Sequence, residues 1–176
     1  SSSIQKNLEK HAPTLEAAGL TYPLRWNPAY TYPHDVFRST GNANPLAYAM
    51  RWKEGEPTYE AFRPERVLED LFARLADSEA AVVSHEDLID APQHFLATLR
   101  DAAAAAGWRV KPVILVRDQI SWHVSSFNQH IRQNGYTGDF EELVARHMAG
   151  PDWWRHVQRF EAVFGRPDVT VRLYHR

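Results

Sequence analysis

The clearest pattern of apolar and polar positions lies in the second half of the chain. A short apolar run over 113–116 ends abruptly in Arg117. Four apolar residues then recur at the i, i+4, i+7 and i+11 spacing of one helix face: Ile120, Val124, Phe127 and Ile131. The sequence therefore predicts a strand that ends at Val116, a helix over 119–134, and burial of that apolar stripe.

Similar patterns predict that helices and strands alternate along the rest of the chain. The first predicted helix carries a helical period over 4–15, opens almost at residue 1 and stops near Gly19. Short buried runs predict strands at 80–84 and 108–116, joined by an alanine-rich helix over 92–106. Further helices are predicted over 45–54, 58–77, 139–148 and 152–164, and a last strand over 169–174.

A strand–helix–strand unit of this length pairs its strands in parallel through a right-handed crossover. We therefore expect one α/β domain over 1–176, built on a parallel sheet. A helix that opens on the first residue leaves such a sheet without its opening strand, and the chain stops just after a strand. From these two features we expect the sequence to be a piece of a larger protein.

Residues 24–43 are rich in Pro, Asn, Tyr and Trp and have no period, which predicts a long irregular loop. Loops of this length in compact domains are usually functional or mobile. Trp26, Tyr30 and Tyr32 would either stack on a sugar or adenine or anchor the loop to the body of the domain. His34 is a polar candidate in the same loop.

Composition adds mainly exclusions. The net charge is −2, with 20 Lys and Arg against 22 Asp and Glu, so any anion-binding site must be local and a nucleic-acid surface is not expected. The absence of Cys excludes disulfides and thiolate metal sites and fits a reducing compartment. No apolar run approaches 18 residues and the first residues are not a secretory signal, so we expect a cytoplasmic protein with no membrane span.

Arg117 and Ser125 are the first candidates for chemistry. Arg117 would leave the carboxyl end of a strand, where open α/β sheets bind ligands, and Ser125 would face the same rim two helical turns later. A guanidinium fork beside a hydroxyl suits a phosphate group. The alternative is that Arg117 pairs with a nearby carboxylate such as Asp118.

Ser1, Ser2 and Ser3 at a helix amino terminus form a second anion-friendly group. The first-turn N–H groups lack partners within the helix, the helix dipole is positive there, and the hydroxyls add donors. The alternative is simple capping of the helix by serine.

Together these segments resemble the PAPS-dependent sulfotransferases, including bacterial members. The run SSSIQKNLEKHAPTLEAAGLTYP is similar to the helix after that family's phosphate loop, K-x-G-[TS]-[TS]-S-[IL]-Q. The run VILVRDQISWHVSSFNQHIR resembles its 3′-phosphate segment, in which Arg is followed eight residues later by Ser. AVVSHEDL and VTVRLYHR resemble a strand-end SSE segment and a late V-x-V-R-x-Y strand.

The resemblance implies a three-layer P-loop-type parallel sheet flanked by helices, whose first strand and phosphate loop are missing from this chain. Ser1 and Ser2 fall where the family's hydroxyls hold the 5′-phosphosulfate, and Ser3 belongs to the same helix start. Arg117 and Ser125 fall on the grip for the 3′-phosphate. The family's phosphate-loop Lys and Gly would precede Ser1, so this piece alone is expected to be inactive or nearly so.

The implied reaction moves a sulfuryl group from PAPS to a hydroxyl acceptor, such as a carbohydrate or small metabolite. A base must take the acceptor's proton. The candidates are Glu86, His85 and His34, each with a structural alternative as a cap or an exposed residue. No metal is expected. A P-loop kinase or nucleotide phosphotransferase, and a non-catalytic binding domain of this fold, are the competing interpretations.

Overall fold

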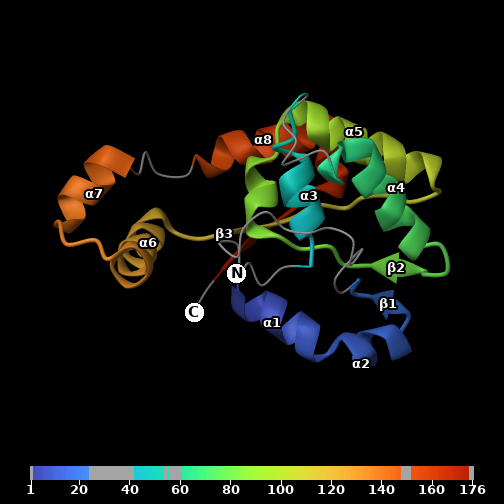
Figure 1. Ribbon diagram of the computed structural model, residues 1–176, viewed down its shortest axis with the longest axis horizontal. Coiled ribbons are helices and arrows are strands. Elements are labelled where there is room, and N and C mark those ends of the chain that lie inside the picture. Colours follow the sequence, from blue (N-terminus) through green and yellow to red (C-terminus); the bar gives the residue numbers. More distant parts are fainter. Residues whose placement is uncertain (1, 24–41, 54, 56–60, 148–151, 175–176) are drawn as a thin grey trace. The chain divides into compact units, whose positions relative to one another are not determined.

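The computed structural model describes residues 2–23, 42–53, 55, 61–147 and 152–174 (Figure 1). The side chains of Ser2, Ser3, Gln133, Arg146 and His147 lie outside the described part. The chain divides between Val110 and Lys111 into two compact units, here called unit 1 (1–110) and unit 2 (111–176). The predicted loop, with His34, Trp26, Tyr30 and Tyr32, lies largely outside the described residues, as does Ser1.

Unit 1 is mainly helical, with one short parallel ladder. Its elements are α1 (Ser2–Lys10), α2 (Ala12–Ala17), β1 (Leu20–Thr21), α3 (Asn44–Ala49), α4 (Pro64–Arg74), β2 (Ala80–Ala81), the 3₁₀ helix η2 (Glu86–Asp90) and α5 (Gln93–Ala105). β1 and β2 pair in parallel, with Leu20 opposite Ala80. The N–H of Val82 extends the ladder by donating to the Thr21 carbonyl at 2.9 Å.

The core of unit 1 lies among α3, α4 and α5, where α4 packs on both of the others (Figure 1). Tyr48 and Phe62 stack with ring centroids 4.7 Å apart. The apolar side chains buried around them are Leu46, Val67, Leu68, Leu71, Phe95 and Leu96. Within α4 and α5 these residues follow helical spacings, as expected of helix faces that pack against one another.

The prediction of one continuous first helix is wrong. The structure has two helices, α1 and α2, which meet at His11. Pro13 explains the break, because proline has no N–H to donate and its ring clashes with the carbonyl four residues earlier. Proline is tolerated in the first turn of a helix, which is where Pro13 lies in α2. Gly19 then follows α2 with φ of 78°, as its predicted stop position requires.

In its described residues, unit 2 holds the second parallel ladder, three α-helices and a 3₁₀ helix. Its elements are β3 (Val113–Val116), α6 (Gln119–Asn134), α7 (Phe140–His147), α8 (Trp153–Phe164), the 3₁₀ helix η3 (Arg166–Asp168) and β4 (Thr170–Leu173). β3 and β4 pair in parallel from Val113 opposite Thr170 to Val116 opposite Leu173. The helix predicted over 119–134 is confirmed, and Gly135 ends it with φ of 63°.

The predicted burial of the α6 stripe is wrong: three of its four residues are exposed, and Phe127 is half-buried. Ile120 is 78% exposed, Val124 46% and Ile131 42%. The Phe127 ring meets the rings of Tyr136 and Phe140 edge to face, with centroids 6.1 and 5.4 Å away. The spacing thus located the helix correctly, and α6 contacts α7 through Phe127 and Phe140, but the stripe as a whole is not buried.

Several predicted boundaries are also too generous. α3 ends at Ala49 rather than at 54, and α4 begins at Pro64, which suits a first helical turn. The strand predicted at 108–116 is paired only from Val113, just after Pro112, which lacks the N–H that a ladder needs.

The protein is therefore mixed α/β with two small parallel sheets among the described residues. The predicted pairing of the strand at 80–84 with the strand at 108–116 remains a prediction, because β2 and β3 belong to different units. The same holds for the single domain and for the three-layer P-loop arrangement.

Candidate functional site

In unit 1, polar side chains gather just beyond the carboxyl end of β2. Asn42 lies alongside this segment, and its side-chain amide makes two hydrogen bonds to it of the kind that a neighbouring strand would make. Its Nδ2 donates to the Val82 carbonyl at 2.8 Å, and its Oδ1 accepts the Ser84 N–H at 2.7 Å. The N–H of Ala43 also donates to the Ser84 carbonyl at 3.3 Å. These bonds fix the backbone at the end of the strand, where Ser84 and His85 follow.

Helix α1 reaches the same point through Gln5. Its side chain is buried, and its Nε2 donates to Ser84 Oγ at 3.3 Å. Gln5 lies in the first turn of α1, so this bond holds the amino end of the helix near the carboxyl end of β2. The backbone of Ser2 and Ser3 belongs to that turn, but their hydroxyls lie outside the described part.

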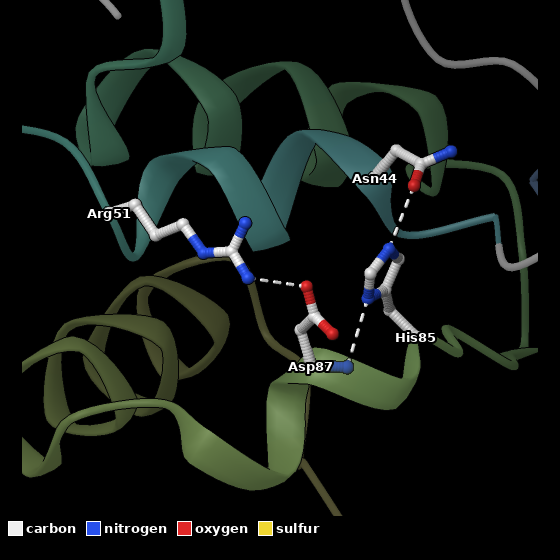
Figure 2. Close-up of polar contacts among 4 residues, drawn as sticks. All are labelled: Asn44, Arg51, His85 and Asp87. Atoms are coloured by element: carbon white, nitrogen blue, oxygen red, sulfur yellow. Dashed lines mark hydrogen bonds and ion pairs between the residues drawn. The ribbon is translucent and has the colours of Figure 1, made fainter. Parts of the chain in front are cut away.

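His85 is the most buried titratable group of this cluster, with 8% of its surface exposed. Figure 2 shows its ring between Asn44 and the backbone of Asp87. The Asp87 N–H donates to Nδ1 at 3.1 Å, and Nε2 lies 2.8 Å from Asn44 Oδ1. Because Nδ1 accepts, we assign the proton of the neutral ring to Nε2, from which it is donated to Asn44.

The surroundings of His85 favour that neutral form. Burial lowers its pKa, the Asp87 carboxylate raises it by a smaller effect, and the Arg51 guanidinium lowers it again. Arg51 Nη2 and Asp87 Oδ2 form an ion pair at 2.6 Å (Figure 2). His85 therefore serves as the amino-terminal cap of η2, a role that sequence analysis had offered to Glu86.

The two predicted bases in this region differ in access. Both ring nitrogens of His85 are engaged, so accepting a further proton at Nδ1 would cost the bond from Asp87. Glu86 is exposed and begins η2 between His85 and Asp87, whose side chains are both held. The geometry therefore gives Glu86 an accessible carboxylate on a fixed backbone. Catalysis by either residue remains a prediction.

In unit 2, Arg117 and Ser125 line one cavity of about 430 Å³ on a face of α6. We call it the α6 groove. Its lining residues are Arg117, Ile120, Ser121, Val124, Ser125, Asn128, Gln129 and Arg132. Arg117 directly follows β3, and Ser125 lies on the second turn of α6. The structure thus brings these two predicted residues together.

The alternative for Arg117, an ion pair with Asp118, does not form among the described residues. Asp118 instead caps α6, since its Oδ1 accepts the Ser121 N–H at 2.8 Å. The backbone and hydroxyl of Ser121 lower the pKa of Asp118, with a smaller contribution from Arg117. The Asp118 carboxylate therefore caps the helix, and the Arg117 guanidinium lines the groove without an ion pair to it.

Ser1, Ser2 and Ser3 belong to unit 1, whereas Arg117 and Ser125 belong to unit 2. Their convergence on one nucleotide therefore remains a prediction. Sequence analysis missed Gln5, Asn42 and Asn44, because side-chain amides that hydrogen-bond to residues distant in the sequence leave no periodic signal. It also missed Arg132, although its spacing of seven residues from Ser125 places both on one helix face.

Within the described residues, no group of three or more His, Asp or Glu side chains is arranged to hold a metal ion. No helix in that part of the chain is both long and apolar enough to span a bilayer. Comparisons with protein-family models, with curated proteins and with solved structures each found no match.

Proposed function

We propose that this chain is a sulfotransferase-like α/β domain of the cytoplasm that uses PAPS as donor and a hydroxyl compound as acceptor. The fold proposed for it is the three-layer P-loop type, with its phosphate loop upstream of Ser1. The observation that supports this function best is the joint position of Arg117 and Ser125 in the α6 groove. The motif that resembles the family's 3′-phosphate segment contains the same two residues.

The positive charge and the hydrogen-bond donors of the groove suit a phosphate group. Arg117 offers a planar fork that matches two phosphate oxygens, and Ser125 offers one hydroxyl. The Asp118 carboxylate is occupied at the helix cap, so it does not neutralise the fork by direct pairing. In this proposal the 3′-phosphate of PAPS lies between Arg117 and Ser125, and the 5′-phosphosulfate lies at Ser1, Ser2 and Ser3.

The proposed reaction is an in-line displacement at sulfur. The acceptor oxygen forms a bond to sulfur while the bond from sulfur to the 5′-phosphate oxygen breaks, which leaves adenosine 3′,5′-bisphosphate. Glu86 takes the proton of the acceptor hydroxyl. Catalysis of this kind depends mainly on positioning and on donors that are fixed before reaction. The held backbone at η2 would supply that fixed position for the base.

Calorimetry on the full chain tests the donor site. Adenosine 3′,5′-bisphosphate and adenosine 5′-monophosphate differ only in the 3′-phosphate, so the ratio of their affinities reports that group alone. Arg117→Ala should weaken binding of the bisphosphate by about 1.5–3 kcal/mol, the range for hydrogen bonds to charged groups, and leave the monophosphate unchanged. Arg166→Ala, at an exposed site in the same unit, is the matched control. Unchanged affinity in Arg117→Ala would reject the proposal.

A further inference from the structure

One added proton would rearrange the cluster of polar contacts around His85. We propose that His85, Asp87 and Arg51 form a pH-sensitive switch, in which protonated His85 takes the Asp87 carboxylate from Arg51 and releases the first turn of η2. The switch goes beyond the proposed function and does not depend on it. Its link to that function is Glu86, the first residue of η2, whose backbone the switch would loosen in acid.

The two ring nitrogens of His85 respond differently to the added proton. In the neutral state Nδ1 accepts the Asp87 N–H at 3.1 Å, and Nε2 donates to Asn44 Oδ1 at 2.8 Å. A proton at Nδ1 turns this acceptor into a donor, so two N–H groups would face each other across that contact. The contact with Asn44 persists, because Nε2 donates in both states. Protonation therefore breaks the cap of η2 and keeps the other anchor of the ring.

The Asp87 carboxylate is the acceptor that the imidazolium would use. A ring that is 8% exposed has little access to water, so its new N–H needs a partner from the protein. Figure 2 shows the carboxylate between the Arg51 guanidinium and the His85 ring. Its ion pair with Arg51 is short, at 2.6 Å, but the Arg51 and Asp87 side chains are 41% and 25% exposed. Ion pairs with that access to water contribute little to stability, so the carboxylate can exchange partners at low cost.

The charged groups that surround His85 set the direction of the switch. Helix α3 contacts η2 and is followed by Arg51, and η2 itself carries Glu86 and Asp87. The α1 side chain that reaches this segment, Gln5, is neutral. Burial lowers the pKa of His85, Asp87 raises it by a smaller effect, and Arg51 lowers it again. The transition therefore lies below about pH 6.5, the usual value for histidine, so the cap is intact at neutral pH and opens in acid.

Nuclear magnetic resonance on the full chain, labelled with nitrogen-15, tests the switch from about pH 8 to about pH 5. The His85 ring reports proton uptake, and hydrogen exchange of the Asp87 amide, corrected for its intrinsic pH dependence, reports the cap. Exchange at Asp87 should become roughly fivefold faster as the ring is protonated, as expected for the loss of a helix cap. The amide of Ala103, which is buried in α5, should keep its protection.

Two variants test the exchange of partners. Arg51→Gln removes the competitor for Asp87, so the midpoint of the His85 titration should rise. Asp87→Asn removes the acceptor of the imidazolium, so the midpoint should fall. Each shift should be about half a pH unit, which corresponds to a partly exposed ion pair. Arg66→Gln, at an exposed arginine on α4, is the matched control and should leave the midpoint unchanged.

Constant protection of the Asp87 amide through the His85 transition would overturn the proposal, because the ring would then be protonated without leaving the cap. A midpoint that either Arg51→Gln or Asp87→Asn leaves unchanged would do the same. Loss of protection at Ala103 over the same pH range would also overturn it, because unit 1 would then unfold as a whole. None of these measurements involves a nucleotide, so they can fail or succeed independently of the proposed donor site.

Discussion

Replacement of Asn44 by alanine tests the buried contacts of His85 most directly. In the native protein His85 Nε2 donates to Asn44 Oδ1 at 2.8 Å, and the ring is 8% exposed. Alanine removes the acceptor without harming the first turn of α3, since alanine has the best helix propensity. The Nε2 proton would then be left in a buried position without its partner.

The expected loss is about 1–3 kcal/mol, the penalty for a buried polar group that loses its partner. Asn44 has other contacts, so a double-mutant cycle with His85→Ala isolates the part that belongs to the pair. Urea unfolding of the four proteins, followed by fluorescence and circular dichroism, gives the coupling free energy. A coupling energy near zero would show that the 2.8 Å contact contributes nothing and would refute this account.

The pH dependence provides a second test of the same contact. Burial lowers the pKa of His85 below the 6.5 of the unfolded chain, so below that pH the unfolded state binds more protons than the native state. The contribution of neutral His85 to the free energy of unfolding is therefore fully present above about pH 6.5, and it is lost as the pH drops toward the lowered native pKa. The slope from this one group cannot exceed about 1.4 kcal/mol per pH unit.

Asn44→Asp distinguishes charge from simple loss of the contact. A carboxylate beside Nε2 favours the imidazolium, so the pKa of His85 rises relative to the native protein and the loss of stability in acid becomes smaller. Asn44→Ala introduces no such charge. If the free energy of unfolding falls in acid by the same amount in Asn44→Asp and in the native protein, His85 is not the group that causes this fall.

Two further predictions concern unit 2, and urea unfolding measures both. Gly135→Ala should lower the free energy of unfolding by about 1–2 kcal/mol, because a residue with a Cβ is strained at φ of +63°. No atom crowds the position of that Cβ, so the loss comes from the backbone alone. An unchanged urea midpoint would contradict the left-handed cap of α6. Phe127→Ala should lower the free energy of unfolding by about 1–3 kcal/mol, because it removes two edge-to-face ring pairs. Ile131→Ala should lower it much less, because Ile131 is exposed on the same helix. Equal losses in the two variants would instead support burial of the whole apolar stripe.

The sequence located the elements well because their signals are local. Gly19 and Gly135 each mark a boundary through backbone conformation, and the apolar run before Arg117 marks the end of a paired strand. The structure places boundaries at all three points. Pro13 was visible in the sequence, but an apolar period that continued past it outweighed the break that proline imposes. Local chemistry was the better guide at that point.

The burial of α6 could not be read from its sequence. An apolar stripe shows which side of a helix would be buried, but it does not show whether another element covers that side. Ile120 and Val124 instead line the same groove as Arg117 and Ser125. The site in unit 1 was equally hidden, since Asn42 and Gln5 act through contacts with residues about 40 and 79 positions away.

The Asn42 amide has a chemical consequence for the long-term integrity of the protein. Its nitrogen must donate to one carbonyl while its oxygen accepts from one N–H. Spontaneous deamidation would replace that nitrogen with a second oxygen, and two oxygens would then face each other across the former bond. Deamidation would thus remove one of three hydrogen bonds that hold residues 42–44 at the strand end, and would loosen the segment that carries Asn44, the partner of the His85 imidazole.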